Sequence, residues 1–258
     1  MDMPIPVVHR PIEALVLDVV ADFTCPWSFL GTRRIARALD AVQGLPAPAV
    51  LRWHGFRLPR APLAQDGGAA SAWREHLAQR LPPGITTGFA ERSLVEAGRT
   101  LGIEFRFDRI RVVPDTLHAH RLVLAAAGQG RHVQVADALF RAYFEQGRDI
   151  GAEAQLLDIG REAGLDTQRL EQFSRGFAAN PALGVGDAGE STGATSTIAV
   201  VLAEEQRLQA LGVQNVPNLL LNGRVLVPGP AEEAIYVQAL DQVLFPEAEA
   251  AAKPRWLH

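Results

Sequence analysis

The run DFTCPWSFLG (22–31) contains the only cysteine of the 258-residue chain, Cys25, followed by Pro26, Trp27 and Ser28. A cysteine reacts as its thiolate, and a position at a helix N-terminus favours this anion because free N–H groups and the helix dipole point at it. Ser28 stands one turn into the expected helix, where its hydroxyl can donate a hydrogen bond to the sulfur. These residues predict thiol chemistry at Cys25; a buried, inert cysteine is the alternative.

The segments around Cys25 predict a strand, a helix and a second strand. ALVLDVVADF (14–23) is apolar and rich in β-branched residues, which is typical of a buried strand. Pro26 suits the first helical position, and SFLGTRRIARALDAV (28–42) has the spacing of an amphipathic helix. AVLRWHGFRL (49–58) predicts a second strand, parallel to the first, because this order is that of a right-handed crossover.

The middle of the chain predicts a block of helices. Apolar residues recur there at i, i+3, i+4 and i+7, the pattern of a helix with one face in a core. A run of Gly, Ala, Ser and Thr at 182–197 predicts a loop. The expected helices cover residues 71–81, 88–102, 115–128, 131–147, 153–163 and 167–178.

The C-terminal part predicts a helix, a hairpin and a last helix. TIAVVLAEEQRLQALG (197–212) carries an apolar stripe. VPNLLLNGRVLVPG (216–229) has two apolar runs joined by Asn222-Gly223, the strongest short signal of a β-hairpin. AEEAIYVQALDQVL (231–244) predicts the closing helix. The whole order is βαβ, a helical block and αββα, which indicates a split α/β domain interrupted by helices.

Five segments resemble, in order and spacing, the DsbA-like family, specifically its cytoplasmic FrnE-like branch. They are DFTCPWSFLGTRRIARAL, FRFDRI, PDTLHAHRL, LFRAYFEQGRDIG and LGVQNVPNLLLNGRVLVPG, and the resemblance spans residues 14–245. It implies an α/β, thioredoxin-like fold with an inserted all-helical domain. The expected parts are a discontinuous thioredoxin-like domain (12–65 and 190–248), a helical insertion domain (66–189) and a frayed tail (249–258).

The resemblance also implies roles for individual residues. Cys25 corresponds to the attacking cysteine of the family, and Pro217 to the cis-proline that lies against it, so that the backbone of Val216 can pair with an extended or thiol substrate. A trans proline at the start of a strand is the alternative for Pro217. We expect catalytic roles for Cys25 and Ser28, and substrate-binding roles for Pro26, Trp27, Trp53, Val216 and Pro217.

Trp53 is included because of its position rather than the resemblance. Together with His54 it stands near the end of the second expected strand, at the edge where ligands bind in open α/β sheets. A core or rim position is the alternative for both residues.

Two departures from the family pattern shape the expected function. Many FrnE-like proteins have a second cysteine where Ser28 stands, and without it an outside thiol must release a mixed disulfide. The family usually has two aromatic residues after the proline and S-G-A-Q after the second strand, whereas this chain has Asn218, Leu219 and VPGP (227–230). We therefore expect a monothiol oxidoreductase with glutathione as co-substrate and no bound cofactor, and the family does not define its substrate.

Two other classes of function stay open. Kappa-class glutathione transferases and 2-hydroxychromene-2-carboxylate isomerases, which belong to the same superfamily, carry a serine near this helix start and bind glutathione there. A glutathione-dependent isomerase or transferase would take a small aromatic or polyketide-like substrate in a pocket between Trp27, Trp53 and the inserted helices. The remaining alternative is a non-catalytic binding or chaperone module.

Composition narrows the partners and the location. The net charge of −4, without a basic stripe, disfavours nucleic acid and anionic membranes as partners. No apolar stretch approaches the roughly 20 residues of a membrane span. The first residues, MDMPIPVVHRPIEAL, lack a signal-peptide core, and a single cysteine excludes an internal disulfide, so we expect a soluble cytoplasmic protein. The sequence leaves monomer and homodimer open.

Three further patterns are given simpler interpretations. GVGDAG (184–189) matches the dinucleotide motif but does not follow a predicted strand, so we expect a loop. His118 and His120 point to different sides of a helix, and we expect no metal site there. Arg121 and Arg148 could hold a carboxylate of glutathione, but surface salt bridges are the favoured interpretation.

Overall fold

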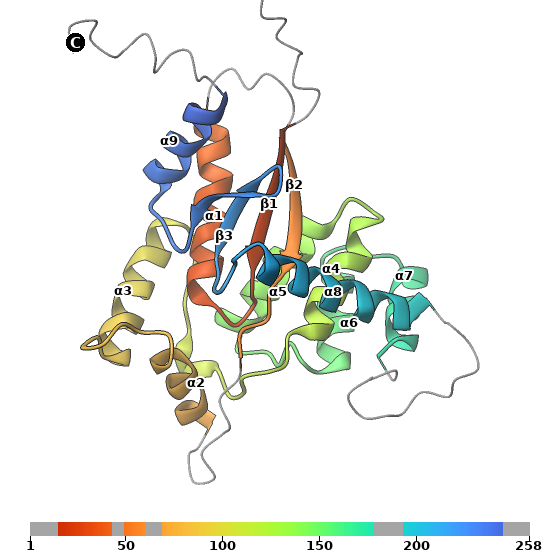
Figure 1. Cartoon of the computed structure of the whole chain (residues 1–258). Coiled ribbons are helices and arrows are strands. Elements are labelled where there is room, and N and C mark those ends of the chain that lie inside the picture. The colour runs from red at the N-terminus through yellow and green to blue at the C-terminus, as the bar shows by residue number, and fades with distance from the viewer. Residues whose placement is uncertain (1–14, 43–48, 60–68, 178–192, 245–258) are drawn as a thin grey trace, which may run out of the picture.

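The computed structural model describes residues 15–42, 49–59, 69–177 and 193–244, and its centre is a four-stranded mixed sheet. The strands lie in the order β2-β1-β3-β4; β1 and β2 are parallel, and β3 is antiparallel to both of its neighbours (Figure 1). The predicted parallel pair and hairpin are thereby confirmed. The strands are β1 (Leu15–Ala21), β2 (Ala49–Gly55), β3 (Asn218–Leu221) and β4 (Arg224–Pro228).

Two helices, the first and the last, cover one face of the sheet. α1 (Pro26–Ala41) and α9 (Glu233–Leu244) lie side by side on the left of the sheet in Figure 1. Because side chains alternate along a strand, Leu17 and Val19 of β1 point to this face and form a core with both helices. This packing holds the N-terminal end of α1 at the end of β1.

The opposite face of the sheet packs against α8 (Gly193–Ala210). Val20 of β1 lies there in one apolar cluster with Leu208 of α8 and with Cys25. The loop predicted for residues 182–197 is wrong at its end, since α8 already begins at Gly193. The rest of that loop, with the GVGDAG motif, lies outside the described residues.

The predicted helical block is present, and the observed helices end within a few residues of the predicted bounds. Polar side chains fix two of their starts: Thr86 accepts a hydrogen bond from the Phe89 N–H at 3.3 Å, and Asp166 accepts one from the Arg169 N–H at 2.7 Å. The elements are α2 (Ala69–Ala78), α3 (Thr87–Thr100), a 3₁₀ turn (Phe107–Arg109), α4 (Leu117–Ala127), α5 (His132–Phe144), α6 (Glu153–Glu162) and α7 (Thr167–Arg175).

The helical block shares a core with the end of β1 and the start of α1. Phe23 and Phe29 lie in the same buried cluster as Phe140 and Phe144 of α5, and Phe29 stacks on Phe140 with ring centroids 5.0 Å apart. The boundary between a thioredoxin-like and a helical domain stays a prediction, because the apolar cluster spans both parts. Among the described helices, none has the length and apolar character needed to cross a membrane.

Candidate thiol site

Cys25 lies at the position before the first turn of α1, opposite the loop that leads into β3. Its backbone is extended there, and its sulfur lies 3.7 Å from the carbonyl oxygen of Val216, to which the thiol donates. The Val216-Pro217 peptide bond is cis, as the resemblance implies. β1 and β3 are paired neighbours in the sheet, so the end of β1 and the start of β3 bring Cys25 and this loop together.

Close packing between α1 and the proline loop depends on Gly31. A Cβ atom at this position would lie 3.1 Å from Cγ and 3.3 Å from Cβ of Pro217, closer than carbon atoms normally approach. The glycine in FLG therefore allows the ring of Pro217 to lie directly on α1, one turn beyond Ser28.

A cavity of about 580 Å³ opens beside the sulfur. This volume is in the range of small-ligand pockets. Polar amides of Gln79, Gln214 and Asn215 stand in its wall, and the charged side chain among its lining residues is Arg80. The apolar part of the wall is formed by Trp27, Leu58, Pro59, Pro82, Val216 and Pro230, with Cys25 among them.

The resting thiol of Cys25 is protonated at neutral pH. Burial raises its pKa to about 11, and the negative charge of Asp22 acts in the same direction, while hydrogen bonds involving Ser28 only partly oppose this. Cys25 is 1% exposed, so desolvation of the anion outweighs the favourable helix terminus. The expectation of a lowered thiol pKa is therefore wrong for this conformation.

Asp22 is a buried residue of the site that the sequence analysis missed. Its carboxylate accepts hydrogen bonds from the N–H and the hydroxyl of Thr24, at 2.7 and 3.0 Å, and from the Leu58 N–H. Burial raises the pKa of Asp22, and these hydrogen bonds act against the shift. The D-x-T spacing of an Asx turn before Cys25 was the signal that could have revealed it.

Arg80 brings a partly unsatisfied positive charge to the cavity. Its guanidinium donates to the carbonyl oxygens of His76 and Pro59, and its Nε is buried without a partner among the residues that the structure describes. No carboxylate of the described residues lies within salt-bridge distance of it. Burial lowers the pKa of Arg80, whereas nearby Cys25 and Asp22 act in the opposite direction. The sequence offered no signal for Arg80, which comes from the turn after α2.

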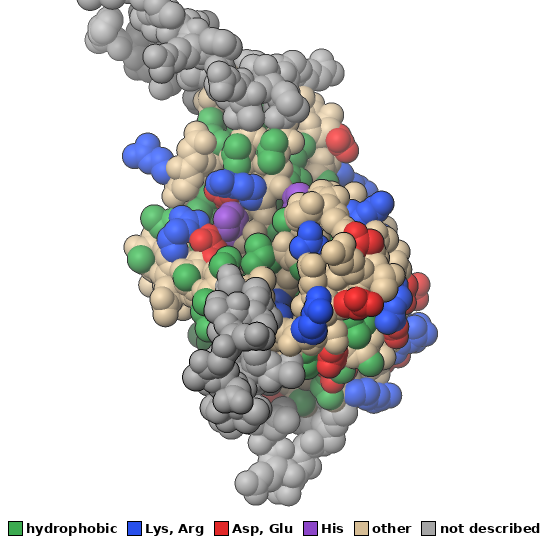
Figure 2. Space-filling view, turned by 90° about the vertical axis from the view of Figure 1, so that its right-hand side faces the viewer, with side chains coloured by type: hydrophobic (Ala, Val, Ile, Leu, Met, Phe, Trp, Pro, Cys, Tyr) green, Lys and Arg blue, Asp and Glu red, His purple; other side chains and the backbone are tan. Residues whose placement is uncertain are grey.

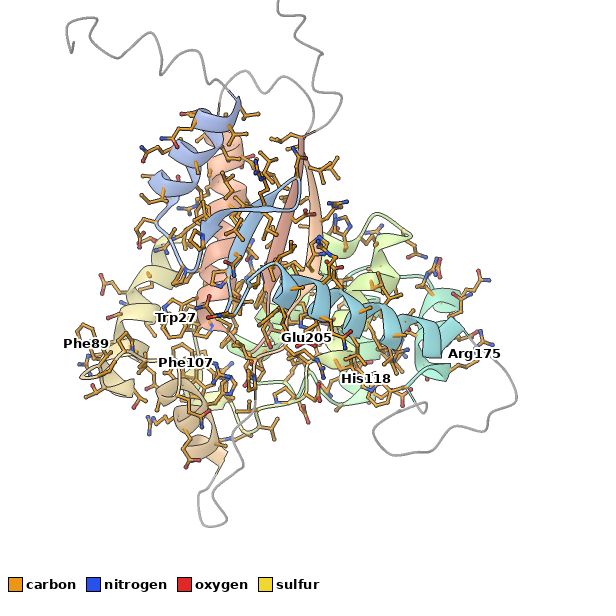
Figure 3. All side chains as sticks on the ribbon, viewed as in Figure 1. Trp27, Phe89, Phe107, His118, Arg175 and Glu205 are labelled. Atoms are coloured by element: carbon orange, nitrogen blue, oxygen red, sulfur yellow. The ribbon has the colours of Figure 1, made fainter. Side chains whose placement is uncertain are left out.

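The structure brings together most of the predicted site residues. Trp27 and Val216 line the cavity with Cys25, and Trp27 lies at the lower end of α1 in Figure 3. Ser28 is fully buried, and its Oγ lies 3.5 Å from the Asp22 N–H. Pro26 and Pro217 are buried beside the site rather than in its lining.

Trp53 is not part of this cavity. It pairs with Val19 in the register of β1 and β2, so its side chain lies on the face of α1 rather than on the face of Cys25. There it stacks on Phe23, with ring centroids 5.1 Å apart, and contacts Phe140. Trp27 lines the cavity beside Cys25 and Trp53 does not, so the described residues do not form the predicted pocket between these two side chains.

Arg121 and Arg148 differ in their surroundings. Arg148 forms a salt bridge with Glu162 at 2.9 Å, as predicted. Arg121 is 2% exposed and bonds to His118 Nδ1 and Thr197 Oγ1, so the prediction of a surface salt bridge is wrong for it. Neither residue is among those lining the Cys25 cavity.

A mixed sheet with helices on both faces, and a cysteine at the start of its first helix opposite a cis-proline, define a thioredoxin-like fold with a helical insertion. The family model described as the DSBA-like thioredoxin domain matches residues 16–184. The match covers more than half of the chain, and the chain belongs to this family. The predicted resemblance and fold class are confirmed.

Solved structures of similar fold include proteins of thiol chemistry. The probable DsbA oxidoreductase SCO1869 from Streptomyces coelicolor is 22% identical, with a TM-score of 0.67 over 95% of this chain and 94% of that one. The cytosolic disulfide reductase DsbM from Pseudomonas aeruginosa, in a structure with GSH, is 21% identical, with a TM-score of 0.57 over 92% of this chain and 100% of that one.

A third similar structure is of an isomerase. The 2-hydroxychromene-2-carboxylate isomerase is 13% identical, with a TM-score of 0.59 over 91% of this chain and 98% of that one. At these identities the likeness is one of fold. No curated protein sequence matches the chain significantly.

Proposed function

We propose that the protein is a monothiol thiol-disulfide oxidoreductase that uses glutathione as co-substrate, with Cys25 as its nucleophile. The observation that carries the proposal is the position of Cys25, opposite the Val216 carbonyl and at the wall of a 580 Å³ cavity. Membership of the DSBA-like family supports thiol-disulfide chemistry at this position. Because Cys25 is the only cysteine of the chain, the protein provides a single sulfur for that chemistry.

The reaction has two exchange steps. The Cys25 thiolate attacks the glutathione sulfur of a mixed disulfide, forms a Cys25-glutathione disulfide and releases the other thiol, which takes up a proton. The thiolate of a second glutathione then attacks the glutathione sulfur bound to Cys25. Oxidised glutathione leaves, and Cys25 returns to its thiol form. The net change is one disulfide reduced and one formed, with no other electron donor.

The cavity suits a peptide thiol with carboxylates. Arg80 offers a positive charge without a carboxylate partner among the described residues, and Gln79, Gln214 and Asn215 offer amide donors and acceptors. A carboxylate of glutathione would accept hydrogen bonds from the guanidinium. The glutathione found in the DsbM structure agrees with this choice of co-substrate, and its description as cytosolic agrees with a reducing compartment.

Activation of Cys25 requires the sulfur to gain solvent or a compensating charge. Burial is the main cause of its raised pKa, so a displacement of the Val216 carbonyl from the sulfur would reduce this burial and lower the pKa. The charge of Arg80 then favours the thiolate. We expect substrate entry into the cavity to produce this displacement.

The test is glutathionylation followed by turnover. Oxidised glutathione should add one glutathionyl group per chain, detected by intact mass, and reduced glutathione should remove it. The protein should also catalyse the reduction of a glutathionylated peptide by glutathione. Cys25→Ser should abolish both the glutathionylation of the chain and the reduction of the peptide. Arg80→Gln should raise the KM for glutathione several-fold with a smaller change in kcat. Turnover that survives Cys25→Ser would refute the proposal.

The raised pKa of Cys25 favours one second candidate. In a glutathione-dependent isomerase or transferase the reacting sulfur belongs to glutathione, and a protonated Cys25 is no obstacle. The fold shared with 2-hydroxychromene-2-carboxylate isomerase is compatible with this chemistry. Retained glutathione binding and small-molecule turnover in Cys25→Ser would favour this candidate.

A further inference from the structure

The two departures from the family pattern, after the cis-proline and after β4, meet at one end of the β3–β4 hairpin. Because these strands are antiparallel, Asn218 at the start of β3 is paired with Pro228 at the end of β4. The loop that contains Val216 and the loop that contains Pro230 therefore lie next to each other. Both loops line the cavity beside Cys25. We call this part of the lining the hairpin wall; it consists of Gln214, Asn215, Val216 and Pro230.

Buried polar side chains hold both loops of the hairpin wall in place. Asn218 is 4% exposed, and its amide nitrogen donates to the carbonyl oxygen of Asn215 at 2.5 Å. Arg34 of α1 is 9% exposed and donates to the carbonyl oxygen of Ala231 at 2.9 Å. Its second terminal nitrogen donates to the carboxylate of the next residue at 2.8 Å. Since Ala231 directly follows Pro230, Arg34 holds this proline at the cavity.

The hairpin wall has an uncharged surface that includes the ring of Pro230. Where the family usually has S-G-A-Q, with two polar side chains, this chain has VPGP (227–230), with none. Pro230 also has no backbone N–H, so a ligand meets its apolar ring rather than a hydrogen-bond donor there. On the side of the molecule where α7 lies, by contrast, acidic and basic side chains are next to one another (Figure 2). The hairpin wall therefore suits a group that is uncharged and apolar.

The positive charge of the cavity lies on another part of its wall. Arg80, the charged residue among the lining residues, belongs to the segment after α2 and donates to the carbonyl oxygen of Pro59. Trp27, at the start of α1, adds a large apolar side chain to the lining. A disulfide with one anionic half and one apolar half would match both parts of this wall.

We propose that the mixed disulfide reduced at Cys25 joins glutathione to a small, uncharged, apolar thiol, such as an alkanethiol. This assignment rests on the proposed thiol-disulfide function. The carboxylates of the glutathione half lie toward Arg80, and the apolar half packs on Pro230, Val216 and Trp27. The Cys25 thiolate forms a bond to the glutathione sulfur while the bond between the two sulfurs of the substrate breaks. The apolar thiol leaves as its thiolate and takes up a proton from solvent, and a second glutathione reduces the disulfide that remains on Cys25.

The test compares the mixed disulfides of glutathione with propanethiol and with cysteamine. The two leaving thiols have the same number of heavy atoms, but one ends in a methyl group and the other in an ammonium group. Chromatography follows the formation of oxidised glutathione from each compound and reduced glutathione, and the rate without protein corrects for the different leaving thiols. The corrected kcat/KM should be at least about tenfold higher for the propyl compound.

Two outcomes of this comparison contradict different claims. Turnover of both compounds with equal corrected kcat/KM would overturn the assignment of an apolar substrate and leave the thiol function intact. Turnover of neither compound would refute the thiol function and the assignment with it.

Variants locate the preference at the hairpin wall. Pro230→Glu should place a carboxylate there and shift the preference toward the cysteamine compound. The matched control is Pro228→Glu, at an exposed proline that does not line the cavity, and it should keep the preference for the propyl compound. Since a new carboxylate affects the Cys25 thiolate equally with both substrates, the ratio of the two kcat/KM values is the readout. A ratio that Pro230→Glu leaves unchanged would also overturn the assignment.

A further variant tests whether Arg34 positions the loop. Arg34→Gln should raise the KM for the propyl compound several-fold, with a smaller change in kcat and in the KM for the cysteamine compound. Equal changes for both compounds would show that Arg34 stabilises the fold without positioning Pro230. The Pro230→Glu result decides the assignment even if Arg34→Gln fails to fold.

Discussion

At the residue scale, the reactivity of Cys25 is decided by a competition between the helix terminus and burial. The sequence predicts its place before the first turn of α1, and the structure agrees. The sequence does not predict how deeply the Cys25 side chain is buried, because the groups that cover it come from distant segments. These groups are Val216 before β3, Leu208 of α8 and Phe56 after β2. Only the tertiary fold brings these apolar groups to the sulfur.

The alkylation of Cys25 should show this competition directly. With a thiol pKa near 11, the thiolate fraction at pH 7 is small and grows as the pH rises. Cys25 should react with iodoacetamide more slowly than free glutathione at pH 7, and its rate should still rise between pH 9 and 11. A rate that levels off below pH 8.5, the ordinary value for a thiol, would contradict the buried resting state.

Asp18 predicts an acid-sensitive contribution to stability. Burial alone would raise its pKa, but hydrogen bonds from His54 and Arg52 outweigh burial and lower it from 3.8 to about 2. Between the two pKa values the unfolded chain binds more protons than the folded chain. The contribution of Asp18 to the free energy of unfolding, about 2 kcal/mol, is therefore present above about pH 4 and is lost toward pH 2.

Urea unfolding at a series of pH values measures this contribution. Asp18→Asn should lower the free energy of unfolding at pH 6 and flatten its fall between pH 4 and 2. Asp241→Asn, at an exposed position on α9, should leave the pH profile unchanged. An equally steep fall in Asp18→Asn would show that other carboxylates cause it.

At the scale of elements, the hairpin was the most predictable part and the surroundings of Trp53 on β2 the least. Asn222 and Gly223 form the predicted turn between β3 and β4, with φ of 51° and 75°. Such a turn is encoded by two adjacent residues. Trp53 was misplaced because its neighbours in sequence do not reveal which helices cover each face of β2.

The hairpin turn gives a local prediction. Gly223→Ala should lower the free energy of unfolding by about 1 kcal/mol, because an L side chain is strained at positive φ. Asn222→Gly should change it by less than about 0.5 kcal/mol, since glycine adopts positive φ readily. Chemical denaturation measures both. Equal effects of the two substitutions would argue against this turn conformation.

At the scale of the whole molecule, the aromatic core joins the sheet to the helical block. Phe140 of α5 contacts Phe23 and Phe29 of the sheet region, with ring centroids 4.9 and 5.0 Å apart. The resemblance predicted that two parts exist, and periodicity predicted their helices. Neither could predict that the parts share one core, because those contacts join residues more than one hundred positions apart.

Unfolding should therefore be a single cooperative transition. Phe140→Ala should lower the free energy of unfolding by about 3–5 kcal/mol, as expected for a buried phenylalanine. Tryptophan fluorescence and far-ultraviolet circular dichroism should report the same midpoint. Phe89→Ala, at a side chain that is 53% exposed, is the control and should have little effect. Two separate transitions would show that the parts unfold independently.

Because Gly31 contacts Pro217, the size of the side chain at position 31 sets the distance between α1 and the proline loop. With 3.1 Å available to a Cβ atom, alanine, serine and valine would push the loop outward in graded steps. Each step would lengthen the separation of the Cys25 sulfur from the Val216 oxygen and admit more water to it. The acidity of the thiol could thus be adjusted from a residue that never meets the substrate.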